Sequence, residues 1–161
     1  MFERPEYLNQ LIKFKDTDFI KVITGVRRSG KSVLLMLFQE HLIKEGVPDD
    51  HIIYMNFESF EYQTITTEEK FREKLNELLP KDTKKIYLLF DEIQVVEGWQ
   101  RVINGIRVSF DSDIVITGSN ANMLSGELAT LLSGRYIEIP IYPFSFQEFL
   151  NVKGIELNSR K

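Results

Sequence analysis

The 161-residue sequence contains no cysteine and only two histidines, His41 and His51. Without cysteine there is no disulfide framework, no zinc site built on thiolates and no cysteine nucleophile. A chain that needs no disulfide suits a reducing compartment, so we expect a cytoplasmic location. Two histidines are too few for an all-histidine metal site, and we expect each to be a surface or helix-end residue.

Long apolar runs and long basic runs are also missing. No apolar run is long enough to span a bilayer, and the first residues do not resemble a secretory signal peptide. The 20 Lys and Arg residues are scattered among 24 acidic residues, which gives a net charge of −4. Binding of nucleic acid without sequence preference needs a concentrated basic surface, so this segment carries no nucleic-acid signal and no membrane signal.

Short apolar runs typical of strands alternate with helix-like segments along the chain. The strand candidates are residues 19–24, 51–57, 86–90, 114–116 and 136–141. The helix candidates are residues 32–43, a segment that begins with a capping box at 66–69, and residues 99–110, 121–132 and 145–150. This alternation predicts an α/β fold in which helices cover both faces of a parallel sheet.

Residues 25–32, Gly-Val-Arg-Arg-Ser-Gly-Lys-Ser, match the Gly-x-x-x-x-Gly-Lys-Ser/Thr pattern of a phosphate-binding loop, also called Walker A. The pattern lies between a strand candidate and a helix candidate, which is the context that the motif requires. Amides at the start of a helix point toward a phosphate, and the helix dipole favours negative charge there. The alternative is a glycine-rich turn with a solvated lysine.

The predicted nucleotide contacts come from the loop and the residue after it: Gly25, Val26, Arg27, Arg28, Ser29, Gly30, Lys31, Ser32 and Val33. In a loop of this kind the lysine reaches the β- and γ-phosphates and the hydroxyl binds Mg²⁺. We therefore predict ATP and Mg²⁺ as ligands, with catalytic Lys31 on the phosphates and Ser32 on the metal. Arg27 and Arg28 either contact phosphate or base, or remain solvated.

Two acidic residues, Asp91 and Glu92, directly follow the apolar run 86–90. Ligands of open α/β sheets bind at the carboxyl ends of the strands, where this pair is predicted to lie. We predict that Asp91 holds Mg²⁺ and that Glu92 activates the attacking water. A small-molecule kinase needs no water-activating glutamate, so the pair favours an ATPase. The alternative is that both residues cap the next helix.

Three further features are predicted at the same edge of the sheet. Asn56 can hydrogen-bond a catalytic glutamate, or it can be a turn residue. Residues 117–120, Thr-Gly-Ser-Asn, can place a polar side chain between the γ-phosphate and Glu92, or Ser119 and Asn120 can cap a helix. Arg135 can reach the nucleotide of a neighbouring subunit, or it can be a surface charge.

Several segments together resemble one family. They are residues 25–32, Tyr54-Met-Asn-Phe-Glu58, Leu89-Phe-Asp-Glu-Ile-Gln94 followed by Trp99, Ile116-Thr-Gly-Ser119, Leu124–Thr130, Ser133-Gly-Arg135 and Pro143–Phe149. They are similar to the AAA-type (AAA+ superfamily) ATPases of prokaryotes, in which an N-terminal ATPase domain precedes a C-terminal domain of unknown function. The similarity runs from about residue 4 to residue 150.

The resemblance implies a P-loop NTPase three-layer sandwich with a five-stranded parallel sheet of order 5-1-4-3-2. It implies that Asp91 and Glu92 form the Walker B pair. Asn120 would be the sensor asparagine, with Ser119 as its nearest competitor. Arg135 would act in trans as an arginine finger, which implies a homo-oligomer.

The chain departs from the family pattern at its end. Residues after Phe149 are too few to supply the helical lid of AAA+ proteins. We therefore expect an ATPase core over residues 1–150 and a polar tail over 151–161, which precedes a missing lid or C-terminal domain. The leading hypothesis is Mg-dependent ATP hydrolysis that drives or times a change in that missing domain. A nucleotide-dependent switch with little turnover, and phosphoryl transfer to a small molecule, are the alternatives.

Overall fold

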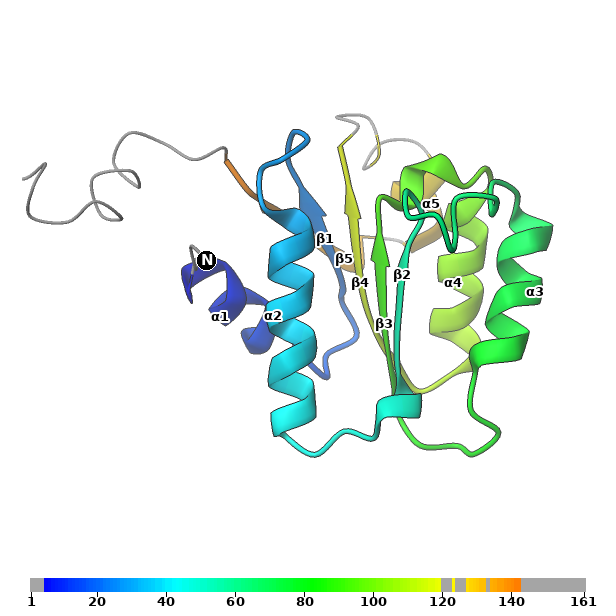
Figure 1. Ribbon diagram of the computed structural model, residues 1–161, viewed down its shortest axis with the longest axis horizontal. Helices are drawn as coiled ribbons and strands as arrows, with labels where there is room; N and C mark the ends of the chain where they lie inside the picture. The colour runs from blue at the N-terminus through cyan, green and yellow to red at the C-terminus, as the bar shows by residue number, and fades with distance from the viewer. Residues whose placement is uncertain (1–4, 120–122, 124–126, 133, 143–161) are drawn as a thin grey trace, which may run out of the picture.

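The computed structural model describes residues 5–119, 123, 127–132 and 134–142 (Figure 1). Its centre is one five-stranded sheet, made of β1 (Ile20–Thr24), β2 (Ile52–Asn56), β3 (Ile86–Asp91), β4 (Ser112–Gly118) and β5 (Tyr136–Pro140). The strand order is β2-β3-β4-β1-β5, and every neighbouring pair is parallel. This is the order 5-1-4-3-2 counted from the opposite edge, so the predicted fold class and sheet order are confirmed.

Helices cover both faces of this sheet. The helices α1 (Pro5–Lys13) and α2 (Lys31–Lys44) lie on one face, and α3 (Glu68–Leu78), α4 (Trp99–Ser109) and α5 (Glu127–Leu132) lie on the other (Figure 1). Side chains of β3 alternate between two apolar cores, because successive residues of a strand point to opposite faces. Leu88 and Phe90 pack in the core with α3 and α4, whereas Tyr87 and Leu89 pack in the core with α2. The whole strand is buried, as its continuous apolar run predicts.

Three local features differ from the sequence-based expectations, and a fourth is not described. The helix α1 was not expected, yet its Leu11 is fully buried in the core beside α2. The capping box is wrong, because the N-cap of α3 is Thr67, which accepts a hydrogen bond from Lys70 N, and a lysine occupies the position that the box reserves for glutamate. Met123 lies in a turn, so the helix predicted to begin at residue 121 begins at Glu127. The predicted helix 145–150 lies outside the described residues.

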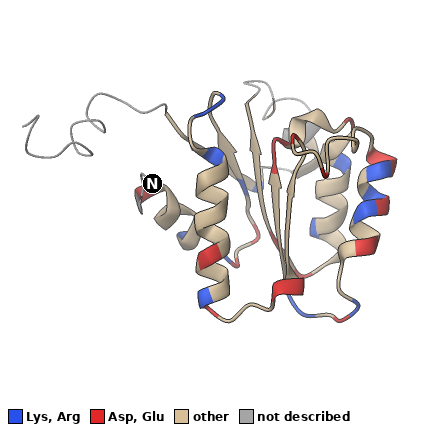
Figure 2. Ribbon diagram, viewed as in Figure 1, with Lys and Arg blue, Asp and Glu red and all other residues tan. Residues whose placement is uncertain are grey.

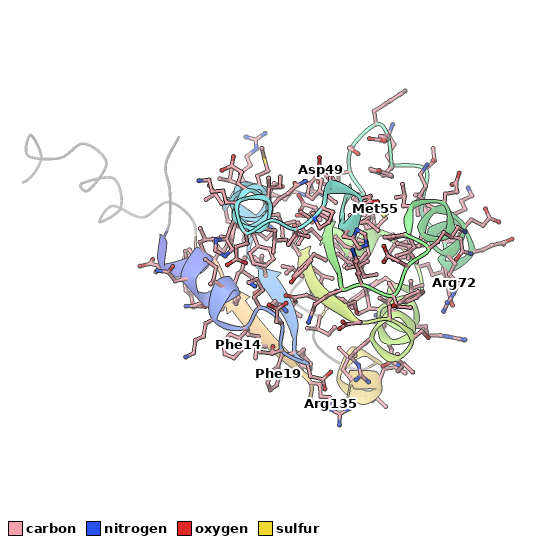
Figure 3. The ribbon with its side chains drawn as sticks, turned by 90° about the horizontal axis from the view of Figure 1, so that it is seen from below. Phe14, Phe19, Asp49, Met55, Arg72 and Arg135 are labelled. Atoms are coloured by element: carbon pink, nitrogen blue, oxygen red, sulfur yellow. The ribbon has the colours of Figure 1, made fainter. Side chains whose placement is uncertain are left out.

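The ends of four strands lie at the carboxyl edge of the sheet. The phosphate loop follows β1, Asn56 ends β2, Asp91 ends β3, and Gly118 ends β4. Arg135 instead precedes β5, and its carbonyl accepts a hydrogen bond of 3.0 Å from Ile20 N at the start of β1. It therefore lies at the amino edge, on the side that Figure 3 shows from below together with Phe14 and Phe19.

The prediction that Arg135 shares the edge of Asn56 and Ser119 is thus wrong. A residue that precedes a parallel strand lies one strand length, about 16 Å for five residues, from the carboxyl edge. In Figure 1 the strands run roughly vertically, so the two edges of the sheet lie at its top and bottom. In the ranges that the structure describes, no helix is both long enough and apolar enough to cross a bilayer.

Candidate active site at the carboxyl edge

The phosphate loop encloses the lysine that precedes Ser32. Lys31 is 4% exposed, and its Nζ donates to the carbonyl oxygens of Gly25 and Val26 at 2.7 and 3.0 Å. Gly30 caps α2 with a φ of 99°, a left-handed conformation that favours glycine. A Cβ on Gly25 would lie 2.6 Å from the Ile141 carbonyl oxygen, so the loop tolerates only glycine there. The backbone thus forms a narrow cradle with a lysine folded into it.

Asp91 is fully buried and accepts three hydrogen bonds from three different elements. Ser32 Oγ donates to Asp91 Oδ2 at 2.6 Å, and the Tyr54 hydroxyl of β2 donates to the same oxygen at 2.9 Å. Thr117 of β4 donates to Asp91 Oδ1 at 2.7 Å. Burial, followed by the charge of Asp91, raises the pKa of Tyr54 well above its usual value, so the phenol stays a donor. The pairing of Ser32 with Asp91 was predicted. Thr117 was expected at this edge but not as a partner of Asp91, and no pattern in the sequence marked Tyr54 as one.

Glu92 is held at its backbone and at its side chain. Its φ of 57° and ψ of 49° are left-handed, which is uncommon for a residue with a Cβ. Its N–H donates to Thr117 Oγ1 at 2.8 Å, and its Oε2 lies 3.5 Å from Lys31 Nζ. Burial raises the pKa of Glu92, but hydrogen bonds from Ser119 and Gln94 and the charge of Lys31 outweigh it, so the pKa lies below its usual value. The carboxylate is therefore ionised at neutral pH.

Ser119 lies where the sequence placed a polar residue between the phosphates and Glu92. Its Oγ donates to Glu92 Oε1 at 2.7 Å, and Lys31 Nζ lies 3.4 Å from the same Oγ. Asn120, the other candidate, lies outside the described residues. The Asn56 side chain accepts a hydrogen bond from Glu58 N at 3.0 Å, which is the turn role of the two that were considered.

These groups surround a pocket of about 480 Å³ above the start of α2. The pocket is lined by the basic residues Arg27, Arg28 and Lys31, by Ser32, and by the acidic residues Glu58 and Glu92. Arg27 forms an ion pair of 2.7 Å with Glu58, and its side chain is 66% exposed. Figure 2 shows the basic positions of the loop before α2 beside the acidic positions that follow the central strands. The pocket thus combines cations for phosphate with carboxylates for a metal and a water.

The residues fit a magnesium nucleotide. Mg²⁺ takes oxygen ligands, usually one or two from the protein, with water and substrate phosphates supplying the rest. The Ser32 hydroxyl and the Asp91 carboxylate, 2.6 Å apart, provide such oxygens beside the cradle. Among the residues that the structure describes, no group of three or more His, Cys, Asp or Glu side chains could bind a metal without a substrate.

The sequence matches a family model described as an AAA domain over residues 17–150. The chain belongs to the AAA domain family. The resemblance found in the motifs is therefore confirmed, and membership of this family supports nucleotide binding and hydrolysis as a general function. The matched residues contain all five strands of the sheet and the pocket at their carboxyl edge.

Two longer relatives have similar sequences to this AAA domain. An uncharacterized protein of Haemophilus influenzae is 61% identical over 160 residues, which cover 99% of this chain and 40% of that protein. An uncharacterized protein of Methanocaldococcus jannaschii is 41% identical over 146 residues, which cover 88% of this chain and 30% of that protein. The chain thus spans less than half of the length of these relatives.

Solved structures share the fold. The AMPPCP-bound DnaA of Aquifex aeolicus has a TM-score of 0.60 and 16% identity, over 96% of this chain and 49% of that chain. A DNA polymerase III gamma subunit-related protein of Thermotoga maritima has a TM-score of 0.60 and 13% identity, over 93% of this chain and 49% of that chain. Identities this low show a shared fold and nothing more specific.

Proposed function

We propose that this AAA domain binds Mg-ATP on residues 25–32 and hydrolyses its γ-phosphate. The observation that carries the proposal is the hydrogen bond of 2.6 Å between Ser32 and Asp91, beside the pocket that Lys31 and Glu92 line. A phosphate-binding lysine, a metal-binding pair and a carboxylate for water are the parts that phosphoryl transfer to water needs. Bound Mg²⁺ would neutralise charge that develops on the phosphate oxygens.

Each side chain has one proposed role in hydrolysis. Lys31 leaves the carbonyl oxygens of Gly25 and Val26 and binds the β- and γ-phosphates, while the loop amides hold the remaining phosphate oxygens. Glu92 accepts a proton from water as the water oxygen attacks the γ-phosphorus. The bond from that phosphorus to the bridging oxygen breaks, and its electron pair leaves with ADP. Ser32 and Asp91 hold the Mg²⁺.

Two further roles complete the proposal. Asn120 or Ser119 senses the γ-phosphate, and the contact of Ser119 Oγ with both Lys31 and Glu92 supports Ser119 as a link between them. Arg135 acts in trans, because it lies at the amino edge, away from the phosphate loop of its own chain. Its side chain is 56% exposed and 3.6 Å from Asp18, so it is available to a second copy.

We also propose that hydrolysis drives or times a change in another part of a longer protein. The relatives support this, because the chain covers only 40% and 30% of their length. In this proposal residues 1–150 are the ATPase core, and residues 151–161 lead toward a lid or a C-terminal domain.

A nucleotide-dependent switch with little turnover is the second candidate. The observation that favours it is the engagement of the Glu92 carboxylate by Ser119, Gln94 and Lys31. A carboxylate that stayed in these contacts after ATP had bound would not meet a water. The two candidates therefore differ in turnover and not in binding.

Glu92→Gln distinguishes them. The amide cannot accept the proton, so the ATPase proposal expects kcat to fall by about 10²–10⁴-fold while ATP affinity is kept. The measurement is phosphate release and nucleotide retention, with the exposed Glu40→Gln on α2 as the matched control. A Glu92→Gln variant that hydrolyses ATP at the wild-type rate would show that Glu92 is not the base, and a wild-type chain that binds ATP without turnover would favour the switch.

A further inference from the structure

Contacts to the backbone and to the side chain together fix the orientation of Glu92. Its backbone is fixed by the hydrogen bond of 2.8 Å to Thr117 Oγ1, which also binds Asp91. Its side chain is fixed at Oε1, which accepts hydrogen bonds from Gln94 Nε2 at 2.8 Å and from Ser119 Oγ at 2.7 Å. The other oxygen, Oε2, lies 3.5 Å from Lys31 Nζ. One oxygen is therefore anchored by neutral donors and the other faces the phosphate-binding lysine.

These side-chain partners respond differently to a bound phosphate. Lys31 lies in the cradle itself, and Ser119 is within 3.4 Å of Lys31 Nζ, so a γ-phosphate competes for both of them. Gln94 instead belongs to η2 (Ile93–Val95), a short 3-10 turn that follows Glu92 directly. Its donated hydrogen bond can persist while phosphate takes the other two partners.

The side-chain amide of Gln94 is closely packed, and its packing and charge fix which atom faces Glu92. A Cβ on Gly118 would lie 2.8 Å from Gln94 Oε1 and would overlap Met123 Sδ, so the amide packs closely against the glycine backbone. Gln94 Oε1 is buried and has no hydrogen-bond partner within the described part of the chain. A reversed amide would set this oxygen against the Glu92 carboxylate, which would be repulsive, so Nε2 faces Glu92. The close packing against Gly118 and the hydrogen bond to Glu92 together hold the Gln94 amide in this orientation.

We infer that Gln94 is a positioning residue that keeps Glu92 Oε1 in place while Oε2 becomes free to accept a proton from water. This inference rests on the proposed function, in which Glu92 is the base. ATP phosphates draw Lys31 away from Oε2, and Gln94 prevents the carboxylate from following the lysine. Gln94 does not line the pocket, and its amide donates to Glu92 Oε1, so we expect it to act on the reaction through Glu92.

Gln94→Met tests the inference, because methionine has a similar length and cannot donate. We expect kcat to fall about tenfold to a hundredfold, while KM for ATP and the thermal unfolding midpoint stay close to wild type. The control Gln10→Met changes an exposed glutamine of α1 and should leave kcat unchanged. A Gln94→Met variant with wild-type kcat, or one in which KM rises as kcat falls, would overturn the inference.

A double-mutant cycle separates positioning from general structure. If Gln94 acts through Glu92, adding Gln94→Met to Glu92→Gln changes the residual rate by less than about twofold. An equal loss in both backgrounds contradicts the inference and leaves the proposed function intact. Wild-type turnover in the single variant Glu92→Gln would instead contradict the proposed function, in which Glu92 is the base.

A measurement without turnover completes the test. In the nucleotide-free chain, the side-chain amide of Gln94 should give one NMR proton signal shifted downfield by its hydrogen bond. Glu92→Ala should return that signal to the position of a solvated amide, whereas Glu40→Ala should not. If the chemical shift is the same in Glu92→Ala as in wild type, the hydrogen bond between Gln94 and Glu92 does not form in solution, whatever the rate of hydrolysis.

Discussion

Ser32 and Asp91 are 59 positions apart in the sequence, yet Ser32 Oγ donates a hydrogen bond to Asp91 Oδ2 across 2.6 Å. The contact joins the first turn of α2 to the end of β3. It marks the place where the hydroxyl and the carboxylate are proposed to share a Mg²⁺.

Lys31→Ala should remove nucleotide binding. Lys31 is the buried cation of the cradle, and loss of one partner of a buried charge contact costs about 2–5 kcal/mol, so we expect the Kd for ATP to rise roughly a hundredfold or more. The apo chain should unfold near the wild-type temperature, because the sheet and α2 keep their backbone hydrogen bonds. Calorimetric titration with ATP measures the effect, and the exposed Lys44→Ala is the control. Wild-type affinity in Lys31→Ala would refute the phosphate loop.

Tyr54→Phe should weaken Mg²⁺ binding. The hydroxyl orients the Asp91 oxygen that also binds Ser32, and loss of a group that orients a metal ligand typically costs about 10–100-fold in metal affinity. We expect the Mg²⁺ concentration for half-maximal ATP binding to rise about tenfold. Tyr87→Phe is a matched control, because its hydroxyl donates to Asp16 Oδ1 at 2.7 Å, away from the site. Equal effects of both changes would mean that Tyr54 has no special relation to the metal.

Arg135→Ala should slow hydrolysis and leave ATP affinity unchanged. An arginine finger in trans is worth a factor of about 10³–10⁵ in kcat, and the wild-type rate should rise with protein concentration as copies associate. The exposed Arg101→Ala on α4 is the control. Mixing Arg135→Ala with Lys31→Ala should restore activity, since one copy keeps an intact loop and the other keeps the arginine. A mixture that stays inactive argues against a role in trans.

His51 should make stability depend on pH. Its Nδ1 lies 2.7 Å from Asp50 Oδ1 and its Nε2 lies 2.9 Å from Asp82 Oδ1, and hydrogen bonds to Asp82 and then to Asp50 raise its pKa above 6.5. A histidine whose pKa is raised by folding contributes stability that is complete below its unfolded pKa and is lost as pH rises through the folded one. The unfolding midpoint of wild type should exceed that of His51→Gln most below about pH 6.5 and progressively less above it. A difference that grows with pH would contradict this assignment.

The phosphate loop and the buried strands could be predicted from the sequence because their signals are local. Gly25, Gly30 and Lys31 must occur at fixed spacing for the backbone to enclose a phosphate, so the motif itself specifies the geometry. The run of residues 86–90 predicts a strand buried on both faces, and all of β3 is buried. The sheet order followed from the family that the motifs resemble, and the strand pairing confirms it.

Other features depended on contacts between distant segments. Tyr54 and Thr117 contact Asp91 because β2 and β4 are the neighbours of β3 in the sheet. No local pattern in the sequence specifies this strand order. The edge of Arg135 is a different case: the residue precedes the strand candidate 136–141, so the parallel sheet already implied the amino edge, and the structure confirms that position. The helix α1 was not predicted. Its apolar side chains pack in the core beside α2, and this contact can be seen only in the folded chain.

The sequence by itself therefore determined which residues can bind phosphate and which strands fill the core, since both depend on spacing along the chain. Only the tertiary structure decided which groups hold Asp91 and Glu92. Hydrogen bonds such as those from Tyr54 and Ser119 form where strand ends converge, and that convergence is a property of strand order and register. The phosphate-loop motif is a local property of the sequence, whereas hydrogen-bond partners of the acidic pair such as Tyr54 and Thr117 come from neighbouring strands of the sheet.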